Sequence, residues 1–257
     1  MMPKYCYQSL INDKENSGIF CDFDGTLTRI APSPSLVQID SLTIETLKHL
    51  IAKYKVVCIV SGRPVNNLKG FINIPGLVLI GNHGAEILES NQLVILSKAR
   101  KASAKIKIAK RELEKIVNKG INLDYKVYSL AIHYRQAQNE DQAKQIILEA
   151  LKNLDLSDLV LNQGRKVFDL KPQGINKGVA VKKLIKKHHL KKCLYIGDDT
   201  TDLDAFRKIK SLRGKGIIKG YIIGKLSSEE VSPQIAKESD FQVETVEEVE
   251  EVLCQLA

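Results

Sequence analysis

Four short apolar runs, each followed by a loop rich in Gly, Asp, Asn or Ser, constrain the fold more than any other feature of the sequence. They are residues 18–23, 56–60, 77–80 and 193–196. Helical patterns over residues 41–53 and 177–188 alternate with these runs, which predicts a parallel sheet with helices on both faces. In such α/β folds the loops at the carboxyl ends of the strands converge on one ligand-binding crevice.

The pattern changes between residues 102 and 172, which marks a second domain. Helical periodicity in this part alternates with strand-like runs in the order α-β-β-α-β-β, over residues 102–119, 122–126, 128–134, 140–154, 159–162 and 166–171. This order predicts a small open-faced sheet with helices on one side. We therefore expect an α/β core formed by residues 1–101 and 173–257, and a smaller α+β cap domain, residues 102–172, inserted between core strands.

The composition limits the class of protein. The 257 residues are 44% hydrophobic and 27% charged, and no segment approaches the roughly 20 apolar residues of a membrane helix. Five cysteines without a CxxC pair indicate reduced thiols, so a cytoplasmic protein with no membrane anchor is expected. The formal charge of +9 suggests an anionic partner, but 5% aromatic residues and no Trp argue against single-stranded nucleic acid.

The segment Asp22-Phe23-Asp24-Gly25-Thr26 begins at the end of the first apolar run. Carboxylates two residues apart point the same way on an extended chain, and Gly25 permits an immediate turn, so Asp22 and Asp24 can face one site. An EF-hand calcium loop needs a third acid before the glycine, which this segment lacks. Taken alone, Asp24-Gly25 is also compatible with a simple turn.

A second acidic segment, Gly197-Asp198-Asp199-Thr200-Thr201-Asp202, follows another apolar run. Three carboxylates this close repel one another unless a cation lies among them, and Mg²⁺ suits a site that also holds water and phosphate oxygens. A solvated acidic turn that opens a helix is the alternative. Ser61, at a strand end, and Lys177, between two nearby glycines, are candidates for binding the oxygens of a phosphoryl group.

The order DxDGT, Ser, Lys, GDDxxD resembles the four motifs of the haloacid-dehalogenase (HAD) phosphatases. Further segments resemble the trehalose-6-phosphate phosphatase family, namely Ser61-Gly62-Arg63, Gly81-Asn82-His83-Gly84-Ala85-Glu86, Ile132-His133-Tyr134-Arg135 and Lys171-Pro172-Gln173-Gly174. The resemblance covers residues 18–206 and implies a HAD-like Rossmannoid core with a cap. Two departures, Leu203 and Asp169-Leu170-Lys171-Pro172, stand where relatives often have Glu and Glu-x-Arg-Pro, which bears on the identity of the substrate.

The resemblance implies roles for the matching residues. Asp22 is the expected nucleophile that forms an aspartyl phosphate, and Asp24 is the expected general acid and base. Ser61 and Lys177 are expected to hold the phosphoryl oxygens. The expected Mg²⁺ ligands are Asp22, Asp24 (through its carbonyl), Asp198, and either Asp199 or Asp202. The candidates for substrate binding are Arg63, His83, Gly84, Glu86, His133 and Arg135.

The predicted activity is Mg²⁺-dependent hydrolysis of trehalose 6-phosphate to trehalose and phosphate. A phosphatase for sucrose phosphate or mannosyl-3-phosphoglycerate is the enzymatic alternative, and a non-catalytic sugar-phosphate-binding regulatory subunit is a second. For His133 and Arg135 a plain polar strand face is equally compatible with the sequence. The expected partner is a small sugar phosphate, with a trehalose-phosphate synthase as a candidate protein partner. A monomer that binds neither nucleic acid nor membrane is expected.

Overall fold

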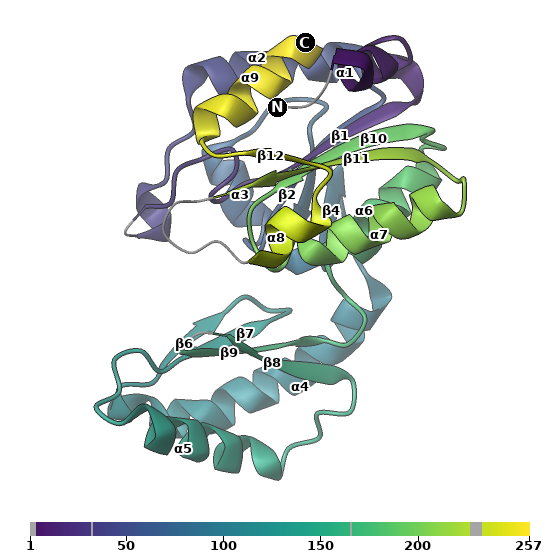
Figure 1. Ribbon diagram of the computed structural model, residues 1–257. Helices are drawn as coiled ribbons and strands as arrows, with labels where there is room; N and C mark the ends of the chain where they lie inside the picture. The colour runs from purple at the N-terminus through teal and green to yellow at the C-terminus, as the bar shows by residue number, and fades with distance from the viewer. Residues whose placement is uncertain (1–3, 32, 165, 227–232) are drawn as a thin grey trace. The chain divides into compact units, whose positions relative to one another are not determined.

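The computed structural model describes residues 4–31, 33–164, 166–226 and 233–257 (Figure 1). The chain forms two compact units. The first unit comprises Met1–Val94 and Asn176–Ala257, and the second is Ile95–Ile175. The cap range predicted from the sequence, residues 102–172, lies inside the second unit, and its assignment as a separate domain stays a prediction.

The first unit is built on an eight-stranded sheet with the strand order β12-β11-β10-β1-β2-β3-β4-β5. Its strands are β1 (Ser17–Asp22), β2 (Val56–Val60), β3 (Val78–Gly81), β4 (Glu86–Glu89), β5 (Gln92–Ile95), β10 (Lys192–Gly197), β11 (Lys219–Lys225) and β12 (Phe241–Val243). Pairing is parallel from β12 to β3 and antiparallel between β3 and β4. Every residue of β1 and β2 is buried, as expected for central strands covered on both faces.

Helices cover both faces of this sheet (Figure 1). One face is covered by α1 (Lys4–Ile11), α2 (Ser41–Lys53), α3 (Val65–Phe71) and α9 (Val246–Leu256). The other is covered by α6 (Lys177–Lys187), α7 (Leu203–Gly214) and α8 (Pro233–Glu238). Short 3-10 turns complete the unit at η1 (Lys14–Asn16), η2 (Pro34–Leu36) and η3 (Asn82–Gly84). The predicted α/β fold class with a parallel sheet is confirmed.

The second unit has the order of elements expected from its sequence. They are α4 (Ser97–Leu113), η4 (Glu114–Lys119), β6 (Asn122–Tyr125), β7 (Leu130–His133), α5 (Glu140–Lys152), β8 (Leu159–Gly164) and β9 (Val167–Pro172). The strands form an antiparallel sheet in the order β6-β7-β9-β8. Ile132 and Phe168 pack with Ile106 of α4 and Ile147 of α5, so both helices lie on one face of this sheet.

Within the described residues, no helix combines the length and the apolar character needed to cross a membrane. The second unit contains the basic helix α4, whose lysines and arginines alternate with a buried stripe. Ala99, Ala102, Ile106, Ala109 and Leu113 form this stripe, at the three- and four-residue spacing of an amphipathic helix.

Candidate active site

The sheet order of the first unit brings the predicted catalytic segments together. β1 pairs with β10 on one side and with β2 on the other, so their carboxyl ends lie side by side. Asp22 is the last residue of β1, Ser61 follows β2, and Asp198 follows β10. These three residues therefore lie at the carboxyl ends of adjacent strands, where the sequence predicts a ligand-binding crevice.

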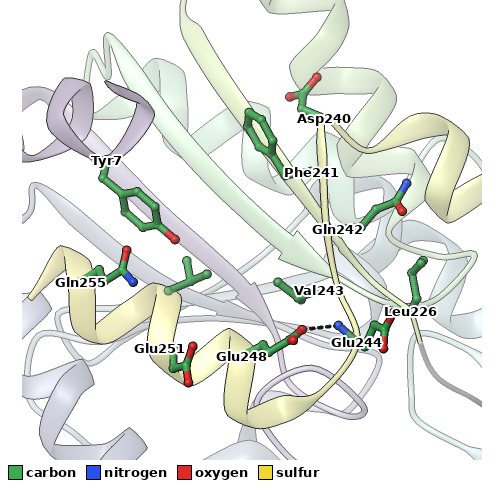
Figure 2. A pocket seen from close by; sticks show the side chains of 11 residues that line it. Tyr7, Leu226, Asp240, Phe241, Gln242, Val243, Glu244, Glu248, Glu251 and Gln255 are labelled. Carbon is green, nitrogen blue, oxygen red and sulfur yellow. Dashed lines mark hydrogen bonds between the residues drawn. The ribbon is translucent and has the colours of Figure 1, made fainter. Parts of the chain in front are cut away.

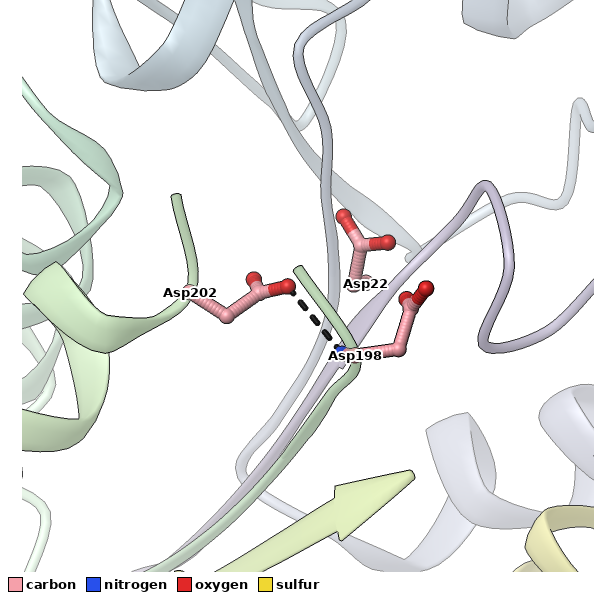
Figure 3. Close-up of side chains that lie close together, drawn as sticks. All are labelled: Asp22, Asp198 and Asp202. Carbon is pink, nitrogen blue, oxygen red and sulfur yellow. Dashed lines mark hydrogen bonds between the residues drawn. The ribbon is translucent and has the colours of Figure 1, made fainter. Parts of the chain in front are cut away.

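Asp22, Asp198 and Asp202 form a carboxylate cluster (Figure 3). One carboxylate oxygen of each lies within 4.8 Å of the others, which is close enough for one metal ion. The Lys177 ammonium, 2% exposed at the start of α6, donates to Asp22 Oδ1 at 2.6 Å and to Asp202 Oδ1 at 2.7 Å. The lysine therefore bridges two of the three acids.

Asp202 is fully engaged within the protein. Besides Lys177, the Tyr195 hydroxyl donates to Asp202 Oδ1 at 2.6 Å. The backbone N–H groups of Asp198 and Asp199 donate to Asp202 Oδ2 at 3.2 and 3.1 Å. The side chain is 0% exposed. Asp202 thus holds the loop that presents Asp198, and Tyr195 is a supporting residue that the sequence did not reveal.

The cluster carries more negative charge than its lysine can balance. Burial raises the pKa of Asp22 well above its usual value; the Lys177 ammonium opposes this, whereas Asp202 and Asp198 add to it. Burial also raises the pKa of Asp198 to about 6, although the hydrogen bond from Thr26 opposes the change. Three carboxylates around one ammonium leave an excess of two negative charges when all are ionised, so the donor set fits a divalent cation with oxygen ligands.

The turn after β1 is shaped around Asp198. Gly25 has a φ of +87°, and a Cβ on it would lie 2.2 Å from Asp198 Oδ2. The Thr26 hydroxyl donates to Asp198 Oδ1 at 2.6 Å. Because a side chain at position 25 would occupy the space of the carboxylate, glycine is required both for the turn and for the site.

Asp24 is held by Arg63. The guanidinium donates from Nε to Asp24 Oδ2 at 2.7 Å and from Nη2 to Asp24 Oδ1 at 2.6 Å. The guanidinium also lies over the rings of Phe71 and Phe23, 4.9 and 5.7 Å from their centroids. The Arg63 backbone N–H donates to Ser61 Oγ at 3.0 Å. The structure therefore places Arg63 beside the predicted acid-base group.

Glu86 has both carboxylate oxygens engaged inside the first unit. Oε2 accepts from the Val65 backbone N–H at 2.6 Å, at the start of α3, and Oε1 accepts from Asn82 Nδ2 at 2.8 Å. The residue is 8% exposed. These contacts fix the loop after β3, and a role of Glu86 in sugar binding stays a prediction.

His83 and Gly84 lie in the same loop, where the backbone has positive φ at successive residues. His83 has a φ of +53° and Gly84 one of +103°. A Cβ on Gly62 would lie 2.5 Å from His83 Cε1, so the imidazole packs on the Ser61-Gly62 segment. A Cβ on Gly84 would lie 2.3 Å from the Asn176 carbonyl oxygen. The loop is thus packed closely between Ser61 and the residue that precedes Lys177.

The remaining predicted residues lie outside this cluster. Asp199 is exposed, and its Oδ1 accepts from the Thr200 backbone N–H at 2.6 Å. His133 ends β7, and Arg135 is exposed two residues later, both in the second unit. Lys225, 7% exposed at the end of β11, is a further lysine that the sequence did not single out. Its positive charge opposes part of the rise that burial causes in the pKa of Asp198.

Comparisons with known proteins identify the family of the chain. The family model described as Trehalose-phosphatase matches residues 20–243. "Probable trehalose-phosphate phosphatase D" from Arabidopsis thaliana is 30% identical over 230 residues, which cover 82% of this chain and 61% of the relative. "Trehalose-6-phosphate phosphatase" from Escherichia coli K12 is 28% identical over 204 residues, covering 77% of this chain and 75% of the relative.

A solved structure shares the fold. The structure of the Candida albicans trehalose-6-phosphate phosphatase C-terminal domain matches with a TM-score of 0.78 at 20% identity, covering 99% of this chain and 96% of that chain. The chain spans 61%, 74% and 63% of the lengths of the first three curated relatives, all from Arabidopsis thaliana. Since the family model extends from the middle of β1 to the end of β12, the chain belongs to the trehalose-phosphatase family.

Proposed function

We propose that this protein hydrolyses trehalose 6-phosphate to trehalose and phosphate through a phosphorylated Asp22. The observation that carries the proposal is that Asp22 and Asp198, at the ends of the adjacent strands β1 and β10, meet beside Lys177 at the start of α6. The family consists of phosphoric monoester hydrolases, and relatives named for trehalose-phosphate support the substrate class.

The first step forms one bond to phosphorus and breaks another. The Lys177 ammonium donates a hydrogen bond to Asp22 Oδ1, which leaves Asp22 Oδ2 to attack the phosphorus atom. As the new bond forms, the bond between phosphorus and the sugar oxygen breaks. Asp24 gives its proton to the departing sugar oxygen. Asp24 then takes a proton from the water that attacks the aspartyl phosphate, which releases phosphate and restores Asp22. The Ser61 hydroxyl and the Lys177 ammonium are proposed to bind the phosphoryl oxygens, where negative charge spreads.

The ion pair between Arg63 and Asp24 bears on the acid role. A carboxylate that accepts from a guanidinium at 2.6 and 2.7 Å cannot at the same time donate a proton. We therefore infer that the pair separates when substrate binds, so that Arg63 becomes available to an oxygen of the substrate. The stacking of Arg63 on Phe71 keeps the guanidinium beside the site when the pair opens.

Mg²⁺ is the proposed cofactor. Asp22, Asp198 and the Asp24 carbonyl would hold the ion, while Asp202, whose oxygens are already engaged, supports the loop, and Asp199 lies outside the cluster. When bound, the ion supplies positive charge that offsets the carboxylates and polarises a phosphoryl oxygen. His83, Gly84, Glu86, His133 and Arg135 remain proposed sugar-binding residues.

The decisive experiment compares Asp22→Asn with Asp199→Asn. The amide cannot attack phosphorus, so we expect turnover of trehalose 6-phosphate to fall by at least about 10³-fold in the first variant. The second removes the same charge nearby and is expected to change turnover by less than about tenfold. Turnover by Asp22→Asn at the level of the unmodified protein would refute the assigned nucleophile.

The substrate is tested separately by measuring kcat/KM for a set of sugar phosphates. Trehalose 6-phosphate should rank first, ahead of sucrose phosphate and mannosyl-3-phosphoglycerate. If one of these ranks higher, the chemistry stands and the substrate assignment fails. Binding of trehalose 6-phosphate without release of phosphate would instead support the regulatory role.

A further inference from the structure

A groove runs along the outer edge of the sheet in the first unit, at the terminal strand β12 (Figure 2). Its volume is about 480 Å³, within the range of small-molecule sites. It is lined by Tyr7, Leu226, Asp240, Phe241, Gln242, Val243, Glu244, Glu248, Glu251, Val252 and Gln255. We refer to this site as the edge groove.

The lining residues define two walls. Five consecutive residues, 240–244, contribute to the groove. Because successive residues of a strand point to opposite faces, a groove that touches all five follows the edge of the strand. Glu248, Glu251, Val252 and Gln255 of α9 lie at positions i, i+3, i+4 and i+7, which form one helix face.

The polar part of the edge groove is acidic. The Arg213 guanidinium neutralises Asp240 through contacts at 2.7 and 2.9 Å. Among the described residues, no ion pair joins Glu244, Glu248 or Glu251 to a lysine or arginine, although the chain has a formal charge of +9. Glu248 accepts from the Glu244 backbone N–H at 2.6 Å, and its charge is otherwise uncompensated there. The groove thus complements a positive charge.

Tyr7 supplies a second, independent indication of a ligand. The residue is 6% exposed, and its hydroxyl has no hydrogen-bond partner within the part of the chain that the structure describes. The hydroxyl points from α1 into the edge groove, toward α9 (Figure 2). Burial and the nearby Glu251 carboxylate raise the pKa of Tyr7 to about 12. A buried hydroxyl without a hydrogen-bond partner costs free energy. A polar ligand group in the edge groove would therefore form a favourable hydrogen bond with the Tyr7 hydroxyl.

The apolar lining of the edge groove indicates which kind of cation it can bind. Phe241, Val243 and Val252 give the groove an apolar surface that a bare metal ion does not need. Among the described residues, the acidic group compact enough for a metal is that of Asp22, Asp198 and Asp202, not the glutamates of this groove. We propose that the edge groove binds a small alkyl polyamine, whose ammonium groups pair with Glu248 and Glu251 and donate to the Tyr7 hydroxyl oxygen while its methylene stem lies on the apolar wall.

Isothermal titration calorimetry of the full chain with spermidine at physiological ionic strength tests the proposal. We expect saturable binding of one molecule per chain. Glu251→Gln should weaken it about tenfold or more, since a charged hydrogen-bond partner is lost. Tyr7→Phe should weaken binding without lowering the melting temperature of the free protein, because the hydroxyl has no partner there. A hydroxyl with a purely structural role would lower the melting temperature.

The matched control is Glu250→Gln, which removes the same charge from the opposite face of α9, where Glu250 accepts from Thr43 Oγ1 at 2.7 Å. It should leave the affinity for spermidine within about twofold. Equal weakening by both glutamine variants, or binding that disappears at physiological salt, would mean general charge attraction and overturn the proposal. Equal affinity for the uncharged 1,8-octanediol would also overturn it. The activity of the catalytic site does not enter these measurements.

Discussion

Replacing Lys177 by Met should destabilise the protein strongly when no divalent ion is present. The ammonium is 2% exposed and contacts Asp22 and Asp202 at 2.6 and 2.7 Å. Removing one partner of a buried ion pair typically costs 3–5 kcal/mol, because a charge is left buried without compensation. Asp202 keeps Tyr195 and two backbone N–H donors, so the loss falls mainly on Asp22. We therefore expect the substitution to lower the free energy of unfolding by about 3 kcal/mol.

Urea denaturation followed by circular dichroism, in EDTA and in saturating Mg²⁺, measures this loss. Mg²⁺ should reduce it, because the ion supplies part of the missing positive charge. The double variant Lys177→Met with Asp22→Asn should recover roughly 1 kcal/mol or more relative to additivity, since it removes the carboxylate that the lysine no longer balances. A loss below about 1 kcal/mol for the single variant in EDTA would refute the view that this lysine balances the cluster.

Three further outcomes follow from the structure. Gly25→Ala should reduce kcat by about 100-fold, since its Cβ would lie 2.2 Å from Asp198 Oδ2, and a steady-state assay showing less than a twofold change would contradict this. Leu10→Ala should lower the free energy of unfolding by about 2–5 kcal/mol, because this α1 side chain is 0% exposed; a loss below about 0.5 kcal/mol would mean that α1 does not pack on the sheet. Burial raises the pKa of Asp169, although the Lys171 ammonium opposes this, so the unmodified protein loses stability relative to Asp169→Asn as the pH rises through the folded-state pKa. Melting curves should show the variant more stable at neutral pH, with the difference vanishing below the usual pKa of 3.8, and a variant less stable at neutral pH would contradict this.

The sequence was sufficient to predict the parallel sheet and the acids at the carboxyl ends of its strands. Continuous apolar runs such as residues 56–60 can be buried on both faces only as central parallel strands, and Asp22 and Asp198 lie at the ends of two such runs. Their adjacency depends on the strand order, in which β10 pairs with β1. The order itself was not part of the prediction, because local pattern does not determine which strands pair.

Contacts made by flexible side chains could not be predicted. The pairing of Arg63 with Asp24 depends on the rotamer of a long side chain, and the contacts of Glu86 with Val65 and Asn82 depend on how a loop closes. Tyr195 occupies an ordinary position in an apolar strand, and its hydrogen bond to Asp202 is evident only from the structure. The helix α1 also went unpredicted, since its residues carry no motif and are identified by their burial.

The point where the chain re-enters the first unit has a mechanical consequence. Asn176 caps α6 by accepting from the Val179 backbone N–H at 2.9 Å, and its carbonyl oxygen lies against Gly84. Lys177 is the next residue, so the anchored asparagine fixes the backbone from which the lysine side chain extends. The Lys177 ammonium is therefore held against Asp22 by contacts that lie within the first unit.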